Sequence, residues 1–290
     1  MAFSGLAAAG ADEPADQLIQ LMAWDTPPND PAVFREMRAC GLTIAGFVPP
    51  AALDNCHAAG LKAIVSDVRT SGYDWTNVDA AQARRQVTEV VELVKHHPAV
   101  YGYYLRDEPT SALFPGLAKV AEAVKELHPG AWPYINLFPN YADMGQLGAA
   151  DYDAYLEKFI AECKPTILSY DHYAPFEGGG LREGYFANLE AVRRAGLRHG
   201  LPIWNIVLAA AHFNYRESSP ADLRFQAYTS LAYGVRGIGY FKYFTSMIGN
   251  YRLGPIDQFG HKTRTDAGEV EIGPRVPLWR RSGRLRGAGR

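Results

Sequence analysis

The stretch Val100-Tyr101-Gly102-Tyr103-Tyr104-Leu105-Arg106-Asp107-Glu108-Pro109 is the most informative part of this chain. Its apolar and aromatic residues predict a buried strand that ends at two carboxylates and a proline, because proline cannot continue a central strand. Pro109 also biases Glu108 toward an extended backbone. A glutamate at the end of a buried strand is poorly solvated, which raises its pKa toward the range of a general acid. A strand-end Glu108 paired with Arg106 is the structural alternative.

Strand-like and helix-like segments alternate on both sides of this stretch. Strands are expected at residues 18–24, 42–48, 61–68, 100–109, 132–138, 166–171, 202–208 and 237–241. Helices are expected between them, near residues 30–40, 51–59, 79–96, 116–128, 151–163, 185–199 and 221–233. Such alternation requires a parallel sheet covered by helices. Eight units fit a closed α/β barrel of the (β/α)8 TIM type, because the first turn, Asp25-Thr26-Pro27-Pro28, lacks the glycines of a nucleotide-binding open sheet.

Both ends of the chain depart from this alternation of strands and helices. Residues 1–13 are small and apolar, and they predict either a remnant of a secretory signal or a disordered tail. A secreted or periplasmic protein is therefore expected, with a cytoplasmic one as the alternative. The barrel is expected over residues 14–265. Residues 266–290 are irregular and rich in arginine, so the eighth helix is expected to be atypical or missing.

Composition limits the function classes. The chain has 290 residues, of which 48% are hydrophobic, and a net charge of −2, which argues against nucleic acid or an anionic membrane as a partner. No apolar stretch is long enough to span a bilayer. The three cysteines, Cys40, Cys56 and Cys163, fit no zinc spacing, and no other pattern predicts a metal site or a cofactor.

Polar and aromatic residues gather at the predicted carboxyl ends of the strands, where barrels of this type form their active sites. The catalytic candidates are Glu108 as the acid and Asp171, in Ser169-Tyr170-Asp171-His172-Tyr173, as the second carboxylate. The candidates for substrate binding are Asp25, Asp67, Arg106, Asp107, Asn136, Tyr170, Tyr173, Asn205, His212, Tyr240 and Lys242. Asp25 and Asp67 are also suited to be helix caps or loop anchors.

Alternation along a strand predicts which of these side chains face inward. Arg106 and Glu108 should share one face, with Asp107 on the other unless the chain has already begun to turn. Asp107 would then contact a substrate hydroxyl or cap the next loop. Glu108 and Asp171, two strands apart, could flank a glycosidic bond. A separation of about 5 Å between their carboxyl groups would favour hydrolysis with retention, and about 6.5–9.5 Å would favour inversion through a water molecule.

The motif at the end of the fourth strand resembles a known family. Residues 101–109 are similar to the Asn-Glu-Pro strand-four signature of barrel glycoside hydrolases of clan A, with Asp107 in place of the asparagine. The resemblance implies that Glu108 is the acid/base and that Asp107 contacts the sugar 2-hydroxyl. The clan's nucleophile on strand seven has no counterpart, because Pro202–Leu208 contains no carboxylate. The segment around Asp171 instead resembles the Tyr-Asp of chitinase-like barrels, whose Asp-x-Glu on strand four is absent.

Three functions follow as hypotheses. The first is a glycoside hydrolase that cleaves a poly- or oligosaccharide, with carbohydrate as its substrate and partner. The second is a catalytically weak carbohydrate-binding barrel, suggested by the missing strand-seven carboxylate. The third is a metal-dependent sugar isomerase or lyase that uses the acidic residues at the strand ends.

Overall fold

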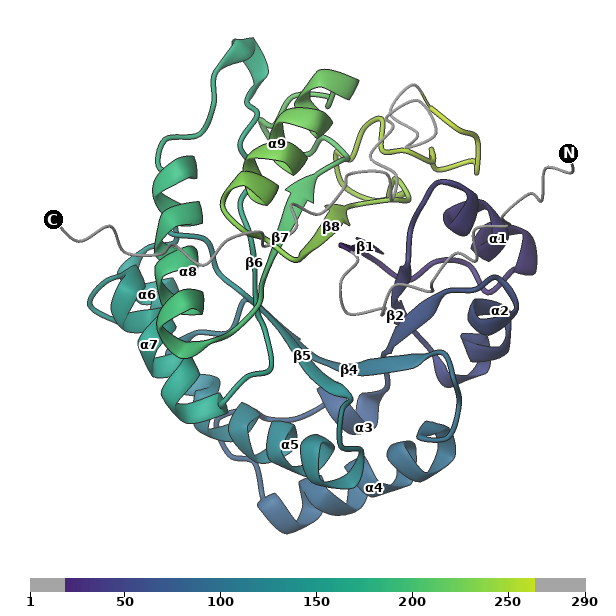
Figure 1. The fold of residues 1–290 in the computed structure, drawn as a ribbon, viewed down its shortest axis with the longest axis vertical. Helices are drawn as coiled ribbons and strands as arrows, with labels where there is room; N and C mark the ends of the chain where they lie inside the picture. Colours follow the sequence, from purple (N-terminus) through teal and green to yellow (C-terminus); the bar gives the residue numbers. More distant parts are fainter. Residues whose placement is uncertain (1–18, 264–290) are drawn as a thin grey trace, which may run out of the picture.

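The computed structural model describes residues 19–263, which form a closed barrel of eight parallel strands. Each strand pairs with its neighbour in the sequence, and β1 closes the ring against β8, with Leu21 opposite Ile238. Figure 1 shows the strands in a central ring and the longer helices around it. The α/β barrel predicted from the alternation is confirmed. The expectations for residues 1–13 and 266–290 lie outside the described residues.

The described elements match the predicted order. The strands are β1 (Gln20–Ala23), β2 (Ile44–Val48), β3 (Lys62–Val65), β4 (Val100–Asp107), β5 (Trp132–Leu137), β6 (Leu168–Asp171), β7 (Ile203–Leu208) and β8 (Gly237–Phe241). The helices are α1 (Pro31–Ala39), α2 (Leu53–Ala58), α3 (Val68–Ser71), α4 (Ala80–Val94), α5 (Phe114–Leu127), α6 (Met144–Leu147), α7 (Tyr152–Cys163), α8 (Tyr185–His199) and α9 (Pro220–Ala232). The sequence interpretation missed the single-turn helices α3 and α6.

Side-chain caps fix where several helices begin. Asp30 accepts a hydrogen bond from the Ala32 amide at the start of α1, directly before Pro31. Ser219 and Asp222 form a reciprocal capping box at the start of α9. These caps satisfy amides that the first helical turn leaves without partners, so the loops enter their helices at defined residues.

Two apolar layers hold the barrel together. The outer layer lies between the strands and the helices. The inner layer fills the barrel itself, and its buried members are Met22, Trp24, Ile44, Phe47, Ile64, Tyr134, Ile167, Trp204 and Ile206. Because aromatic side chains of this layer block the barrel interior, a ligand can be bound only above them, at the carboxyl ends of the strands.

The chain after β8 does not form the helix of a regular barrel within the described residues. Residues 242–263 are irregular and run beside α1, between this helix and α9 (Figure 1). The prediction of an atypical or missing eighth helix therefore agrees with the structure as far as residue 263. Over residues 19–263, no helix has the length and apolar character needed to cross a membrane.

A close approach inside the barrel gives a stability test. A Cβ atom added at Gly237 would lie 2.0 Å from Cε2 of Trp204, which is buried. Gly237→Ala should therefore overpack the barrel and lower the free energy of unfolding by about 1–3 kcal/mol, measured by urea denaturation. Gly180→Ala is the control, since no atom lies within 4 Å of its Cβ position. Equal stability of the two variants would contradict this packing.

Candidate active site

A cavity of about 300 Å³ opens at the carboxyl ends of the strands. Carboxyl groups from β4, β6 and the turn after β4 line it, together with aromatic side chains from β8 and from the loops after β5, β6, β7 and β8. The lining residues are Asp107, Glu108, Phe138, Pro139, Tyr141, Ala142, Gln146, Asp171, Tyr173, His212, Phe213, Tyr215, Phe241 and Tyr251. The two predicted catalytic carboxylates thus share one cavity.

The end of β4 departs from regular strand geometry, and this places both of its acids in the cavity. The pairing of β4 with β5 shifts register between Tyr104 and Arg106. Glu108 has a φ of 42°, in the left-handed region, while its amide donates to the Asn136 carbonyl at 2.9 Å. The extended backbone expected for Glu108 is therefore wrong. Asp107 lines the cavity and Arg106 is exposed, so the stated exception to strand alternation applies: the chain has already begun to turn at the end of β4.

Asn136 joins the carboxyl groups of two strands. Its Nδ2 donates to Oδ1 of Asp107 at 3.1 Å and to Oδ1 of Asp171 at 2.8 Å. The Ser169 hydroxyl donates to Oδ1 of Asn136 at 2.9 Å and lies 2.8 Å from the Tyr134 hydroxyl. The amide is thereby fixed with its nitrogen toward the carboxyls, which a freely rotating asparagine would not guarantee.

Burial and repulsion between neighbouring negative charges raise the pKa values of the three acids, Asp107, Glu108 and Asp171. Burial raises the pKa of Asp107 to about 6, against the hydrogen bond from Asn136, which lowers it. Burial and the Asp107 charge raise the pKa of Glu108 to about 7. The pKa of Asp171 is raised well above its ordinary value by burial and by both neighbouring acids. Glu108 and Asp171 are in hydrogen-bond contact, so the pair shares a proton near neutral pH.

Most of the other residues that line the cavity are aromatic. Tyr173 stacks on Phe241 with ring centroids 5.3 Å apart, and His212 packs edge-on against Tyr173 at 5.3 Å. Tyr215 lies 4.8 Å from His212. Of the predicted binding residues, Tyr173 and His212 therefore line the cavity together with the acids. Ring faces of this kind suit the apolar faces of sugars.

Three other predicted binding residues face away from the cavity. Tyr170 and Tyr240 belong to the apolar layer between the strands and the helices. Asn205 donates from Nδ2 to the Ser230 hydroxyl on α9 at 2.9 Å. All three alternate with inward residues on their strands, so the structure does not bring them to the carboxyl cluster.

The remaining predicted residues are engaged near the strand ends. Asp25 forms an ion pair with Lys242, and the Lys242 ammonium lies 4.9 Å from the ring centre of Tyr251, which lines the cavity. Asp67 caps α3 and pairs with Arg69 at 2.8 Å, which lowers the pKa of Asp67. Asp67 thus has the helix-cap role weighed as its alternative.

Sequence reasoning missed several residues of the cavity. Three of them are loop tyrosines that lie several residues after the ends of β5, β7 and β8, namely Tyr141, Tyr215 and Tyr251. Arg182 stacks over the Tyr141 ring at 3.8 Å and donates to the Tyr215 hydroxyl at 2.8 Å, so it braces this wall. The only available signal was the abundance of tyrosine in these loops, which does not say where each ring points.

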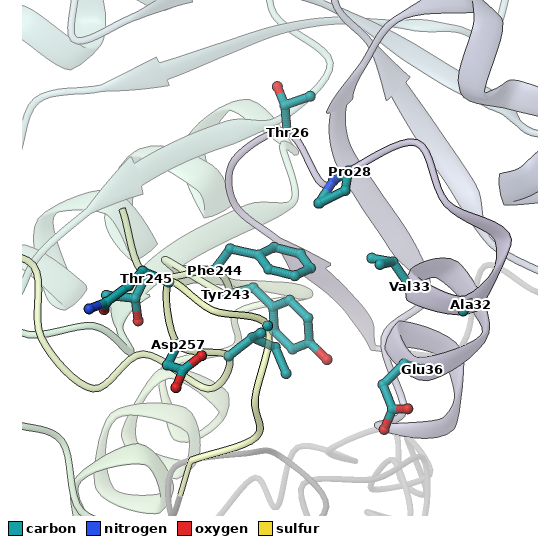
Figure 2. Close-up of a pocket in the computed structure, with 12 residues that line it drawn as sticks. Thr26, Pro28, Ala32, Val33, Glu36, Tyr243, Phe244, Thr245 and Asp257 are labelled. Carbon is teal, nitrogen blue, oxygen red and sulfur yellow. The ribbon is translucent and has the colours of Figure 1, made fainter. Parts of the chain in front are cut away.

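A second cavity, of about 460 Å³, lies outside the barrel and lacks this chemistry. It separates α1 from the segment after β8, with Val33 on one side and Tyr243 and Phe244 on the other (Figure 2). Glu36, at its edge, is ion-paired with Lys262. Although this cavity is larger, it contains no group of neighbouring acids, so the cavity at the strand ends is the candidate active site.

No arrangement of three or more His, Cys, Asp or Glu side chains suited to a metal ion occurs within residues 19–263. Oδ1 of Asp107 and Oδ1 of Asp171 each accept a hydrogen bond from the Asn136 amide nitrogen. The described residues thus give the metal-dependent hypothesis no ligand set.

Comparison with known proteins identifies the fold. No family model and no curated protein matches the sequence. A β-galactosidase from Marinomonas ef1 aligns with a TM-score of 0.64 at 12% identity, over 87% of this chain and 58% of that one. A family GH128 endo-β-1,3-glucanase from Sorangium cellulosum aligns with a TM-score of 0.58 at 16% identity, over 89% and 100%. These two glycoside hydrolases share the barrel fold of this chain.

A putative α-L-fucosidase from Bacteroides thetaiotaomicron aligns over 93% of this chain and 96% of its own, with a TM-score of 0.58 at 10% identity. The resemblance to barrel glycoside hydrolases is therefore confirmed at the level of the fold. At these identities, the comparisons carry no assignment of substrate or catalytic residues to this chain.

The raised pKa values predict how stability depends on pH. Folding raises the pKa of Asp107 from 3.8 to about 6 and the pKa of Glu108 from 4.5 to about 7. Between the lower and the higher value of each group, the folded state binds more protons than the unfolded state. The stabilisation is therefore full below about pH 4 and is lost as pH rises through 6 and 7. Relative to Asp107→Asn/Glu108→Gln, the wild type should lose about 5 kcal/mol between pH 4.5 and 7.5.

Urea denaturation across this pH range measures the difference. Glu89→Gln is the matched control, because its side chain is 65% exposed on α4, and its curve should follow the wild type. A constant difference between the wild type and the double variant would show that these carboxyls have ordinary pKa values.

Proposed function

We propose that this protein is a glycoside hydrolase, with Glu108 as the general acid. The observation that carries the proposal is the contact of Glu108 with the buried Asp171 at the end of a glycoside hydrolase barrel. A carboxyl group with a pKa of about 7 is protonated often enough at neutral pH to donate, and its carboxylate is still a useful base. The aromatic side chains of the cavity give the sugar an apolar surface.

In the proposed reaction, the carboxyl cluster donates one proton and accepts another. Glu108 gives its proton to the glycosidic oxygen as the bond from that oxygen to the anomeric carbon breaks. A water molecule forms the new bond to that carbon, and its proton passes to the carboxylate pair. Because the hydrogen bond with Asp171 lowers the pKa of Glu108 while the pKa of Asp171 is raised well above its ordinary value, we assign Asp171 as the proton partner, with Asp107 holding the negative charge of the cluster.

The substrate is proposed to be a carbohydrate bound by the sugar unit that reacts. Asp107, Tyr173 and His212 line the cavity beside the reacting pair and are proposed to contact the sugar. The absence of any acidic residue from β7 also leaves the carbohydrate-binding barrel as a second candidate. Binding of sugars without turnover would distinguish it from the enzyme.

Glu108→Gln tests the general acid. The variant keeps the size of the side chain but cannot donate a proton to the leaving oxygen, so kcat should fall by about 10²–10⁴-fold. The measurement is hydrolysis of a panel of oligosaccharides and p-nitrophenyl glycosides with unactivated and activated leaving groups. Activated substrates should lose less, because they need less protonation. Glu89→Gln should match the wild type, and equal rates for Glu108→Gln would remove Glu108 from the mechanism.

The pH dependence of kcat/KM tests the coupling within the cluster. The alkaline limb should reflect loss of the proton near pH 7, as a property of the coupled pair. The Asp107 charge raises the pKa of Glu108, so Asp107→Asn should move this limb to lower pH. An alkaline limb that stays in place in the variant would show that the two groups do not interact.

A further inference from the structure

The edge of the cavity next to β7 and β8 presents large apolar side chains to solvent. Phe213 lines the cavity, yet it is 74% exposed. Met247 and Ile248, in the segment after β8, are 82% and 79% exposed. Scattered apolar residues are normal on a surface. An apolar group at the opening of a ligand cavity is a candidate for ligand contact. We call these three residues the apolar rim.

The backbone of Phe213 is held in an unfavourable conformation. Its φ of 47° lies in the left-handed region, which a bulky residue rarely adopts. The Asn250 side chain fixes it, accepting from the Phe213 amide at 2.9 Å and donating to the Phe213 carbonyl at 3.3 Å. Such strain persists where surrounding contacts impose it, and it is concentrated at functional sites. The fold thus holds this ring outward at the opening.

Asn250 also connects the members of the rim. Backbone pairing between Ala211 and Arg252 places the loop after β7 beside the segment after β8. The two hydrogen bonds of Asn250 extend this contact to Phe213, and Met247 and Ile248 stand three and two residues before Asn250 in the sequence. Phe213 lines the cavity, and Met247 and Ile248 lie outside its lining, on the segment that Asn250 joins to Phe213.

The geometry of the cavity decides which part of a glycoside reaches the rim. Trp24, Phe47 and Tyr134 are buried in the barrel beneath the carboxyl cluster, so no ligand extends downward. A sugar whose glycosidic oxygen meets Glu108 must then direct its leaving group toward the opening. Phe213 and Tyr141 are aromatic side chains that line this opening and reach solvent, and Phe213 is the more exposed of the two, at 74% against 37%.

We propose that the apolar rim binds the leaving group of the substrate and that this group is apolar, an alkyl chain or an aryl ring, instead of a second sugar. The side chains of the rim offer no hydrogen bonds to hydroxyl groups. The Asn250 side chain, which joins the two segments of the rim, is bound to the backbone of Phe213. This inference rests on the proposed glycosidase activity and specifies its substrate class.

The test is a series of glycosides that share one sugar. The sugar is the one hydrolysed fastest in the p-nitrophenyl panel, and the leaving groups are methanol, butanol, hexanol and octanol, each below its micelle concentration, with the matching disaccharide for comparison. The value of kcat/KM should rise at least 10-fold from methyl to octyl and should exceed that of the disaccharide. Transfer of methylene groups from water to the rim supplies this gain.

Two variants assign the effect to the rim. Phe213→Ser and Met247→Ser should flatten the chain-length dependence, because each variant should lower kcat/KM for the octyl glycoside more than kcat/KM for the methyl glycoside. Leu197→Ser is the control, because this exposed residue lies on α8, outside the lining of the cavity. It should keep the dependence of the wild type.

The outcomes separate this inference from the proposed function. Hydrolysis that requires Glu108 but is independent of chain length, or faster for the disaccharide, overturns the apolar rim and leaves the glycosidase intact. An unchanged chain-length dependence in Phe213→Ser also overturns it. No hydrolysis of any glycoside by the wild type overturns both proposals.

Discussion

The hydrogen bonds of one asparagine determine what the cavity can do. Asn136 Nδ2 donates to Asp107 and Asp171, which belong to the two strands on either side of its own. Without this shared donor, the buried carboxylates of Asp107 and Asp171 would repel each other and turn apart. The amide therefore keeps three acids within one small volume, where removal from water raises their pKa values.

This arrangement depends on the packing below it. The hydroxyls of Ser169 and Tyr134 orient the Asn136 amide, and Tyr134 belongs to the aromatic layer that fills the barrel. The apolar core thus supports the acids through a short chain of hydrogen bonds. It also closes the cavity from beneath, so chemistry and substrate approach are confined to the face formed by the loops.

The loops divide the cavity by chemical character. Acids come from β4 and β6, and aromatic rings come from the loops after β6, β7 and β8. Arg182 stacks between Tyr141 and Phe176 and stiffens the aromatic side. An apolar wall excludes water from the acids, which is the physical reason why their protons are held so tightly.

The sequence by itself determined the barrel, because alternating apolar strands and amphipathic helices admit few other folds, and it determined that Glu108 and Asp171 end strands of the same sheet. Only the tertiary structure decided where their neighbours point. Asp107 enters the cavity through a register shift, and Glu108 adopts a left-handed φ before a proline. Tyr141, Tyr215 and Tyr251 reach the site from loops. Strand periodicity is a local property readable in the chain, whereas irregular backbone and loop direction are set by contacts between residues far apart in sequence.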